Sequence, residues 1–191
     1  MVAPTFKVSR SSSAAPLRDT ERLRYRLDVV ACSVADLIQS AGGWLYDRAM
    51  AGWEVTALLP DGCDDRALRI LGVRGLGLEE RFATLGTGST SHTLAVSAEA
   101  FSVDTRVRDT VLRSLDDRMT EVALWGRSAQ EWPLRVNRLI TRSQHRLSAA
   151  ARTFKGYALA AEGISGIAVD PVEALLCDVR SPIDTELIRL D

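Results

Sequence analysis

Apolar residues follow two different periods between positions 26 and 62, and together they predict a strand, a helix and a second strand. Residues 27–31 are mostly apolar and β-branched in part, as in a strand buried on both faces. Ser33 then offers a hydroxyl N-cap for a helix. After it, apolar residues recur at three- and four-residue steps, typical of one helix face: Leu37, Ile38, Ala41, Leu45, Ala49 and Met50. Gly52 is placed to end this helix.

The second strand of this unit is predicted at residues 53–59, and Pro60, Asp61 and Gly62 form a turn after it. Two strands joined by a helix of this length are nearly always parallel. In such sheets ligands bind beyond the carboxyl ends of the strands. We therefore expect the loops at 32–36 and 60–65 to border a site.

The remaining pattern predicts further elements of the same kind. Helices are expected at residues 64–71, 107–117, 134–162 and 170–176, the last because Asp170, Pro171 and Glu173 resemble a capping box. Strands are expected at residues 73–78, 92–97 and 120–126, and residues 183–190 indicate an edge strand or a partner-binding peptide. Together these elements predict an α/β fold with a mostly parallel sheet and helices on both faces.

Composition predicts one domain with two tails. The chain has 191 residues, of which 46% are hydrophobic, enough for one sizeable core. Residues 1–22 are rich in Ser, Pro and Ala and predict a flexible tail, mildly basic through its arginines. The domain is expected to cover residues 23–162, followed at 163–191 by a C-terminal helix and an extended tail.

Charge and cysteine content exclude several classes of protein. The formal net charge of −1 provides no overall attraction to nucleic acid or to acidic membranes. The three cysteines are widely spaced and form no CxxC pair, which favours free thiols in a reducing compartment. No apolar run approaches the roughly 18–20 residues that span a bilayer. We expect a cytoplasmic protein without a membrane partner.

The first unit carries a family resemblance. Residues 29–31 end the first strand, residues 41–43 (Ala-Gly-Gly) lie in the helix, and residues 61–62 (Asp-Gly) follow the second strand. This arrangement resembles the opening of the LmbE-like (PIG-L) family of zinc-dependent N-acetylglucosamine deacetylases. The resemblance extends over most of residues 26–160 and implies a Rossmann-like α/β fold.

The residues that perform the family's chemistry are replaced in this chain. Ser33 stands where the family has its first metal-binding His, and Ala35 where it has the Asp general base, whereas Asp36 matches a metal-binding Asp. At the family's second metal motif, Asp104 remains, but Arg106 and Asp109 stand where the family has His. A catalytic zinc site needs three protein ligands, usually His and carboxylate. The resemblance therefore implies a relative that has lost its metal.

We expect a catalytically inactive, deacetylase-like protein without a cofactor, acting as a binding, regulatory or assembly subunit. A vestigial pocket would be lined by Cys32, Ser33, Asp36, Asp61, Asp104, Arg106 and Asp109 and would take a small polar ligand, such as an amino sugar or a nucleotide, or a protein partner. One alternative is an active hydrolase acting on an N-acetylated amino sugar, with a metal held by oxygen ligands only. Another is binding of nucleic acid or an acidic partner through a helical face formed by Arg135, Arg138, Arg142 and Arg146.

Overall fold

Eight strands form a single sheet in the computed structural model, which describes residues 25–82, 92–117, 120–126, 132–178 and 187–189. The predicted tail at residues 1–22 lies outside the described residues. The strand order is β3-β2-β1-β4-β5-β7-β6-β8. Their bounds are β1 Arg26–Val30, β2 Glu54–Leu59, β3 Arg74–Gly77, β4 His92–Ser97, β5 Thr120–Trp125, β6 Ile140–Arg146, β7 Val172–Asp178 and β8 Leu187–Arg189.

The sheet has a parallel part and an antiparallel part. Neighbouring strands in the series β3-β2-β1-β4-β5 pair in parallel. Strand β7, in contrast, pairs antiparallel with β5 and with β6. At the edge, β8 pairs antiparallel with β6, which confirms the predicted edge strand for the residues described there. The predicted mostly parallel α/β sheet is therefore confirmed.

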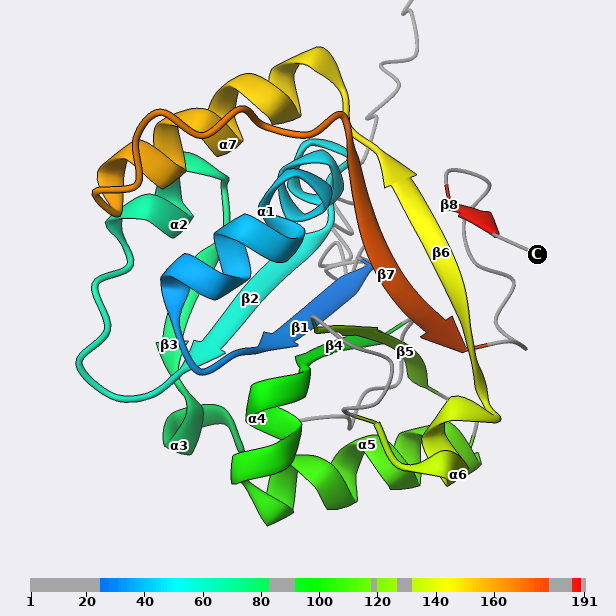
Figure 1. Ribbon diagram of the computed structural model, residues 1–191. Helices are drawn as coiled ribbons and strands as arrows, with labels where there is room; N and C mark the ends of the chain where they lie inside the picture. Colours follow the sequence, from blue (N-terminus) through cyan, green and yellow to red (C-terminus); the bar gives the residue numbers. More distant parts are fainter. Residues whose placement is uncertain (1–24, 83–91, 118–119, 127–131, 179–186, 190–191) are drawn as a thin grey trace, which may run out of the picture.

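Helices cover both faces of the sheet, as predicted (Figure 1). On one face α1, α2 and α7 pack over one hydrophobic cluster, and on the other α4, α5 and α6 pack over a second. The helix bounds are α1 Val34–Met50, α2 Arg66–Ile70, α3 Leu78–Arg81, α4 Ala98–Val103, α5 Thr105–Asp117, α6 Leu134–Asn137 and α7 Ala149–Ala161. The short helix α4 was not anticipated.

The predicted unit of strand, helix and strand is confirmed in detail. The Ser33 side chain caps α1 by accepting a hydrogen bond of 3.1 Å from the amide of Asp36. Leu37, Ile38, Ala41 and Leu45 are completely buried against the sheet, whereas Met50 is exposed. Gly52 follows the helix with a φ of 90°, a left-handed conformation that favours glycine.

The long helix predicted at residues 134–162 is wrong, because its middle part is strand β6. Residues 140–146 alternate between the two faces of the sheet, and Ser143 and His145 point inward and are buried. The inward residues are polar, which hid the two-residue period. Pairing with β7 along the whole length of β6 outweighs the local helical spacing.

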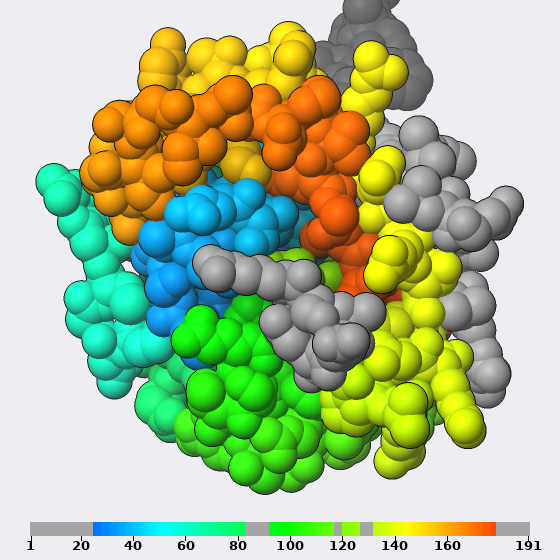
Figure 2. Space-filling model, viewed as in Figure 1, coloured from blue at the N-terminus to red at the C-terminus, as the bar shows by residue number. Residues whose placement is uncertain are grey.

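The helix predicted at residues 170–176 is also wrong, because residues 172–176 belong to strand β7. Glu173, Leu175 and Cys177 point to the buried face, and this two-residue period decides the structure. Figure 2 shows the segment before β7 in orange, packed beside α1 in blue. Ile164 and Val169 of this segment contact the cluster beneath α1 and α7.

Two smaller sequence observations can be compared with the structure. None of Cys32, Cys63 and Cys177 forms a disulfide, as predicted. Among the described helices, none has both the length and the apolar character needed to cross a membrane.

Candidate binding cleft

The strand order places a crevice at the carboxyl ends of β1 and β4. These two strands are neighbours in parallel, and the chain leaves β1 toward one face of the sheet and β4 toward the other, as the positions of α1 and α4 show (Figure 1). Such a point in a parallel sheet is where ligands ordinarily bind. Ser33 and Ser97 stand at this point, and each caps the helix that follows it.

A polar cleft of about 700 Å³ opens at this position. It lies between the loops after β1, β4 and β5, and its walls carry two carboxylates, three hydroxyls and one amide. The lining residues are Ser33, Ala35, Asp36, Gln39, Ser97, Ala98, Glu99, Ser102, Trp125 and Gly126. This volume is typical of sites for small molecules.

Asp36 is the oriented carboxylate of the polar cleft. Its Oδ2 atom accepts a hydrogen bond of 3.2 Å from the indole Nε1 of Trp125, and its Oδ1 accepts one of 3.3 Å from Ser40. Trp125 is only 1% exposed, so it acts as a fixed support for Asp36 and offers no stacking surface to a ligand. Carboxylate oxygens accept several hydrogen bonds each, so Asp36 retains capacity for a donor in the cleft.

The predicted vestigial pocket is divided between two cavities. Ser33 and Asp36 line the polar cleft, whereas a neighbouring, mainly apolar pocket of about 270 Å³ is lined by Cys32, Asp61, Asp104 and Arg106 together with residues of β1, α4 and α5. Asp109 is exposed on α5 and lines neither cavity. The structure thus does not gather the predicted residues into one site.

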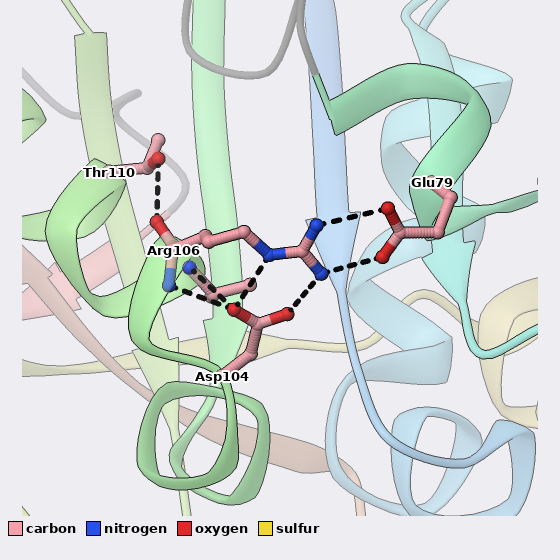
Figure 3. Close-up of polar contacts among 5 residues, drawn as sticks. Glu79, Asp104, Arg106 and Thr110 are labelled. Carbon is pink, nitrogen blue, oxygen red and sulfur yellow. Dashed lines mark hydrogen bonds and ion pairs between the residues drawn. The ribbon is translucent and has the colours of Figure 1, made fainter.

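Arg106 holds together the rim of the apolar pocket (Figure 3). Its guanidinium donates to both oxygens of Asp104, at 3.2 and 2.8 Å, and to both oxygens of Glu79, at 2.9 and 2.6 Å. It also lies 4.5 Å above the ring centre of Phe82. Hydrogen bonds from Arg106 lower the pKa of both carboxyls. The guanidinium therefore connects α3 with the start of α5.

Cys32 experiences the negative charge that gathers at this end of the sheet. Burial raises the pKa of its thiol, and the carboxylates of Glu99, Asp36 and Asp104 raise it further. A thiolate is the reactive form of cysteine. The surroundings of Cys32 therefore suppress nucleophilic chemistry there.

The residues at the cleft do not fit a zinc ion. Ser33 offers a hydroxyl that is engaged as an N-cap, and Ala35 offers no ligand. Asp104 lines the other pocket, where its carboxylate is paired with Arg106. Within the described part of the chain, no group of three or more His, Cys, Asp or Glu side chains could hold a metal. Zinc in proteins prefers His and Cys, and the cleft presents neither among its lining residues.

Both histidines lie away from the polar cleft. His92 starts β4, at the opposite end of the strand from Ser97, and its Nε2 lies 3.1 Å from Oδ2 of the buried Asp28. His145 lies in β6, with its Nε2 2.8 Å from Oδ2 of Asp47. Each histidine therefore has a structural carboxylate partner.

The predicted helical face of four arginines is wrong, because its members lie on different elements. Arg135 is in α6 and pairs with Asp116, and Arg138 follows that helix. Arg142 and Arg146 are exposed on strand β6. The described structure therefore gives no continuous helical row for nucleic acid.

Five cleft residues with polar side-chain atoms were not predicted from the sequence: Gln39, Ser97, Glu99, Ser102 and Trp125. Ser97 and Trp125 end β4 and β5, and Glu99 and Ser102 follow β4. Both strands were predicted. The sequence feature that could have predicted these cleft residues was therefore their position at the carboxyl end of a parallel strand. The order of the strands was needed to bring them beside Ser33.

Comparisons with known proteins show the fold. No protein-family model matches this chain, and no curated protein matches it. Among solved structures, the A40926 pseudoaglycone deacetylase Dbv21 superposes with a TM-score of 0.55 at 15% identity, over 90% of this chain and 99% of that one. The zinc-inhibited form of teicoplanin deacetylase Orf2 gives 0.54 at 12% identity, over 87% of this chain and 99% of that one.

A triple mutant of a deacetylase of the teicoplanin biosynthetic pathway gives a TM-score of 0.53 at 14% identity, over 87% of this chain and 99% of that one. All three identities are too low to transfer an activity. The likeness to these three structures is therefore one of fold. The chain shares its fold with these deacetylases.

Proposed function

We propose that this protein is a catalytically inactive, metal-free relative of the deacetylases, and that it acts by binding a small polar ligand in the polar cleft. The observation that carries the proposal is the lining of the cleft: Asp36 is held in position by Trp125, while a hydroxyl and a methyl group stand at the positions of Ser33 and Ala35. The cleft offers carboxylates and hydroxyls that can bind a ligand. At Ser33 and Ala35 it lacks the metal ligand and the general base that catalysis would need.

The charge of the cleft favours an amine over a phosphate. Asp36 and Glu99 line it, and no Lys, Arg or His is among the lining residues. A phosphate would meet repulsion there, whereas an ammonium group could donate charge-assisted hydrogen bonds to the carboxylates. An amino sugar also matches the hydroxyls of Ser33, Ser97 and Ser102. We therefore favour an amino sugar over a nucleotide. Binding of this ligand would serve a regulatory or assembly role.

Titration with glucosamine, N-acetylglucosamine and uridine monophosphate, followed by NMR, tests this proposal. We expect glucosamine to bind most tightly and Asp36→Asn to weaken it about tenfold or more, because a charge-assisted hydrogen bond is lost. Asp109→Asn is the matched control, since Asp109 is exposed outside both cavities, and should leave the affinity unchanged. Tighter binding of the nucleotide, or equal binding in the Asp36→Asn variant, would contradict the proposal.

Elemental analysis and an activity assay test the absence of catalysis separately. The protein is expected to contain no stoichiometric transition metal after purification and to release no acetate from N-acetylglucosamine. Stoichiometric metal together with acetate release would instead establish the alternative, an active hydrolase with oxygen ligands.

A further inference from the structure

Two buried side chains, those of Glu173 and Lys155, form hydrogen bonds with backbone groups of α1 next to the polar cleft. The amide of Gly43 donates to Oε1 of Glu173 at 2.9 Å, and the amide of Trp44 donates to Oε2 at 2.7 Å. Both amides lie in the middle of the helix, where amides ordinarily donate to the carbonyl four residues earlier. A carboxylate from β7 therefore reaches groups that normally serve only the helix itself.

Lys155 of α7 completes the arrangement from the other side. Its Nζ atom donates to Oε1 of Glu173 at 2.6 Å and to the carbonyl oxygen of Gln39, also at 2.6 Å. Gln39 is four residues before Gly43, so its carbonyl is the ordinary acceptor for the Gly43 amide. Lys155 and Glu173 are only 5% and 4% exposed. The ion pair thus enters the hydrogen-bond ladder of α1 at one defined point.

Gly43 also leaves room for a neighbouring side chain. A Cβ atom at this position would lie 2.5 Å from both Cδ atoms of Leu147, a residue that follows β6. Any side chain would displace the end of the Leu147 side chain from α1. Glycine at residue 43 therefore lets Leu147 pack against the helix beside the Glu173 contact.

The insertion point also borders the polar cleft. Gln39 lines the cleft and presents its carbonyl to Lys155, while Ser33 and Asp36 lie in the two helical turns before it. Lys155 and Glu173 therefore contact α1 directly after the helical turns that line the cleft.

We propose that Lys155 and Glu173 are positioning residues, which set the first half of α1 so that Ser33, Asp36 and Gln39 face the cleft. This inference deepens the proposed function and rests on it for the use of the cleft. A buried ion pair is weak evidence for a role in stability, because well-packed apolar residues often replace such a pair at no cost. The contact with the cleft wall gives the pair a second role that an apolar replacement lacks.

The test compares Lys155→Met/Glu173→Leu with Arg152→Met, a control on the exposed face of the same helix. The double variant is expected to fold, with the NMR signals of the Trp125 indole and of the amides at 33–39 shifted and its affinity for glucosamine reduced roughly fivefold to tenfold. The control should change neither. Unchanged indole and amide signals in a folded double variant would overturn the inference.

The NMR signals decide the inference even if the wild-type protein does not bind glucosamine. In that case the proposed function fails, while the position of the cleft wall is still measured. If the double variant does not fold, Glu173→Gln takes its place, because its amide nitrogen cannot accept the hydrogen bond that one carboxylate oxygen accepts. The same signals are expected to shift in that variant, and their constancy would overturn the inference equally.

Discussion

Carboxylates at the two ends of the parallel strands are used in opposite ways. On the side of the amino ends, Asp28 in the middle of β1 is completely buried and contacts Arg26 at 2.6 Å and His92 at 3.1 Å, the first residues of β1 and β4. At the carboxyl ends, Asp36 and Glu99 face an open cleft that has no cationic lining residue. A paired, buried carboxylate stabilises the fold, whereas an oriented, uncompensated one is available to a ligand. This difference supports the proposal that a ligand binds at the carboxyl ends of the strands.

Glu173 belongs with the paired group although it lies close to the cleft. Its carboxylate accepts two backbone amides of α1 as well as the ammonium of Lys155. The comparison therefore predicts large effects on stability for Glu173, intermediate ones for Asp28 and small ones for Asp36.

Glu173→Leu, with Lys155 retained, is expected to have the largest effect. It leaves the ammonium of Lys155 buried without its counter-charge, which typically costs about 3–5 kcal/mol. Urea denaturation followed by circular dichroism measures the loss. The double variant Lys155→Met/Glu173→Leu should recover most of it. If Glu173→Leu alone were as stable as the wild type, Glu173 would not be a stabilising, paired carboxylate, and the prediction would be contradicted.

Gly43→Ala tests whether α1 must approach its neighbours so closely. The added methyl group would lie 2.5 Å from Leu147, and overpacking of this kind costs about 1–3 kcal/mol. Gly156→Ala in α7 is the matched control, because its nearest neighbour would be Val169 at 3.9 Å. There the helical preference for alanine should stabilise the protein by about 0.5–1 kcal/mol. Thermal denaturation of the two variants should show shifts of opposite sign.

Asp28→Asn tests whether the buried carboxylate of Asp28 stabilises the fold in a pH-dependent way. Burial alone would raise the pKa of Asp28, but hydrogen bonds from His92 and Arg26 outweigh burial and lower it. Since the folded-state pKa lies below the unfolded value, this carboxylate contributes stability above about pH 4, and the contribution is lost as the pH falls further.

We expect Asp28→Asn to lose about 1–2 kcal/mol at pH 7 and to show a flatter decline of stability below about pH 4 than the wild type. Urea denaturation at several pH values measures both effects. Parallel curves for the two proteins below this pH would show that Asp28 has no lowered pKa.

Asp36→Asn should have the smallest effect on stability. Asp36 is half-buried, and its side-chain hydrogen bonds to Trp125 and Ser40 are long, at 3.2 and 3.3 Å. We expect a change of about 0.5 kcal/mol or less in urea denaturation, although ligand binding should be impaired. A loss as large as that of Asp28→Asn would remove the distinction between the two ends of the sheet.

Local patterns were sufficient to predict the first half of the fold. The caps at Ser33 and Gly52 and the apolar face of α1 are encoded within a few residues of one another. The second half failed where distant partners decide the structure. Glu173 completes an apparent capping box in sequence, yet it binds the amides of a helix 130 residues away.

The candidate site was predictable only in part for the same physical reason. Ser33 and Asp36 follow a predicted strand directly, so their place at the cleft could be expected. Trp125 supports Asp36 from a strand 89 residues further along the chain. No local period encodes that contact, because it depends on which strands become neighbours in the sheet. The separation of Cys32 and Arg106 into another pocket depends on side-chain packing in the same way.

The place of β7 between β5 and β6 has a consequence for synthesis on the ribosome. Glu173 and Gly43 are separated by 130 residues, so the middle of α1 receives its acceptor only after most of the polypeptide has been translated. Contacts between such distant residues slow folding. A nascent chain halted before residue 172 would carry β6 without β7, its principal pairing strand, and would be exposed to aggregation and to proteases.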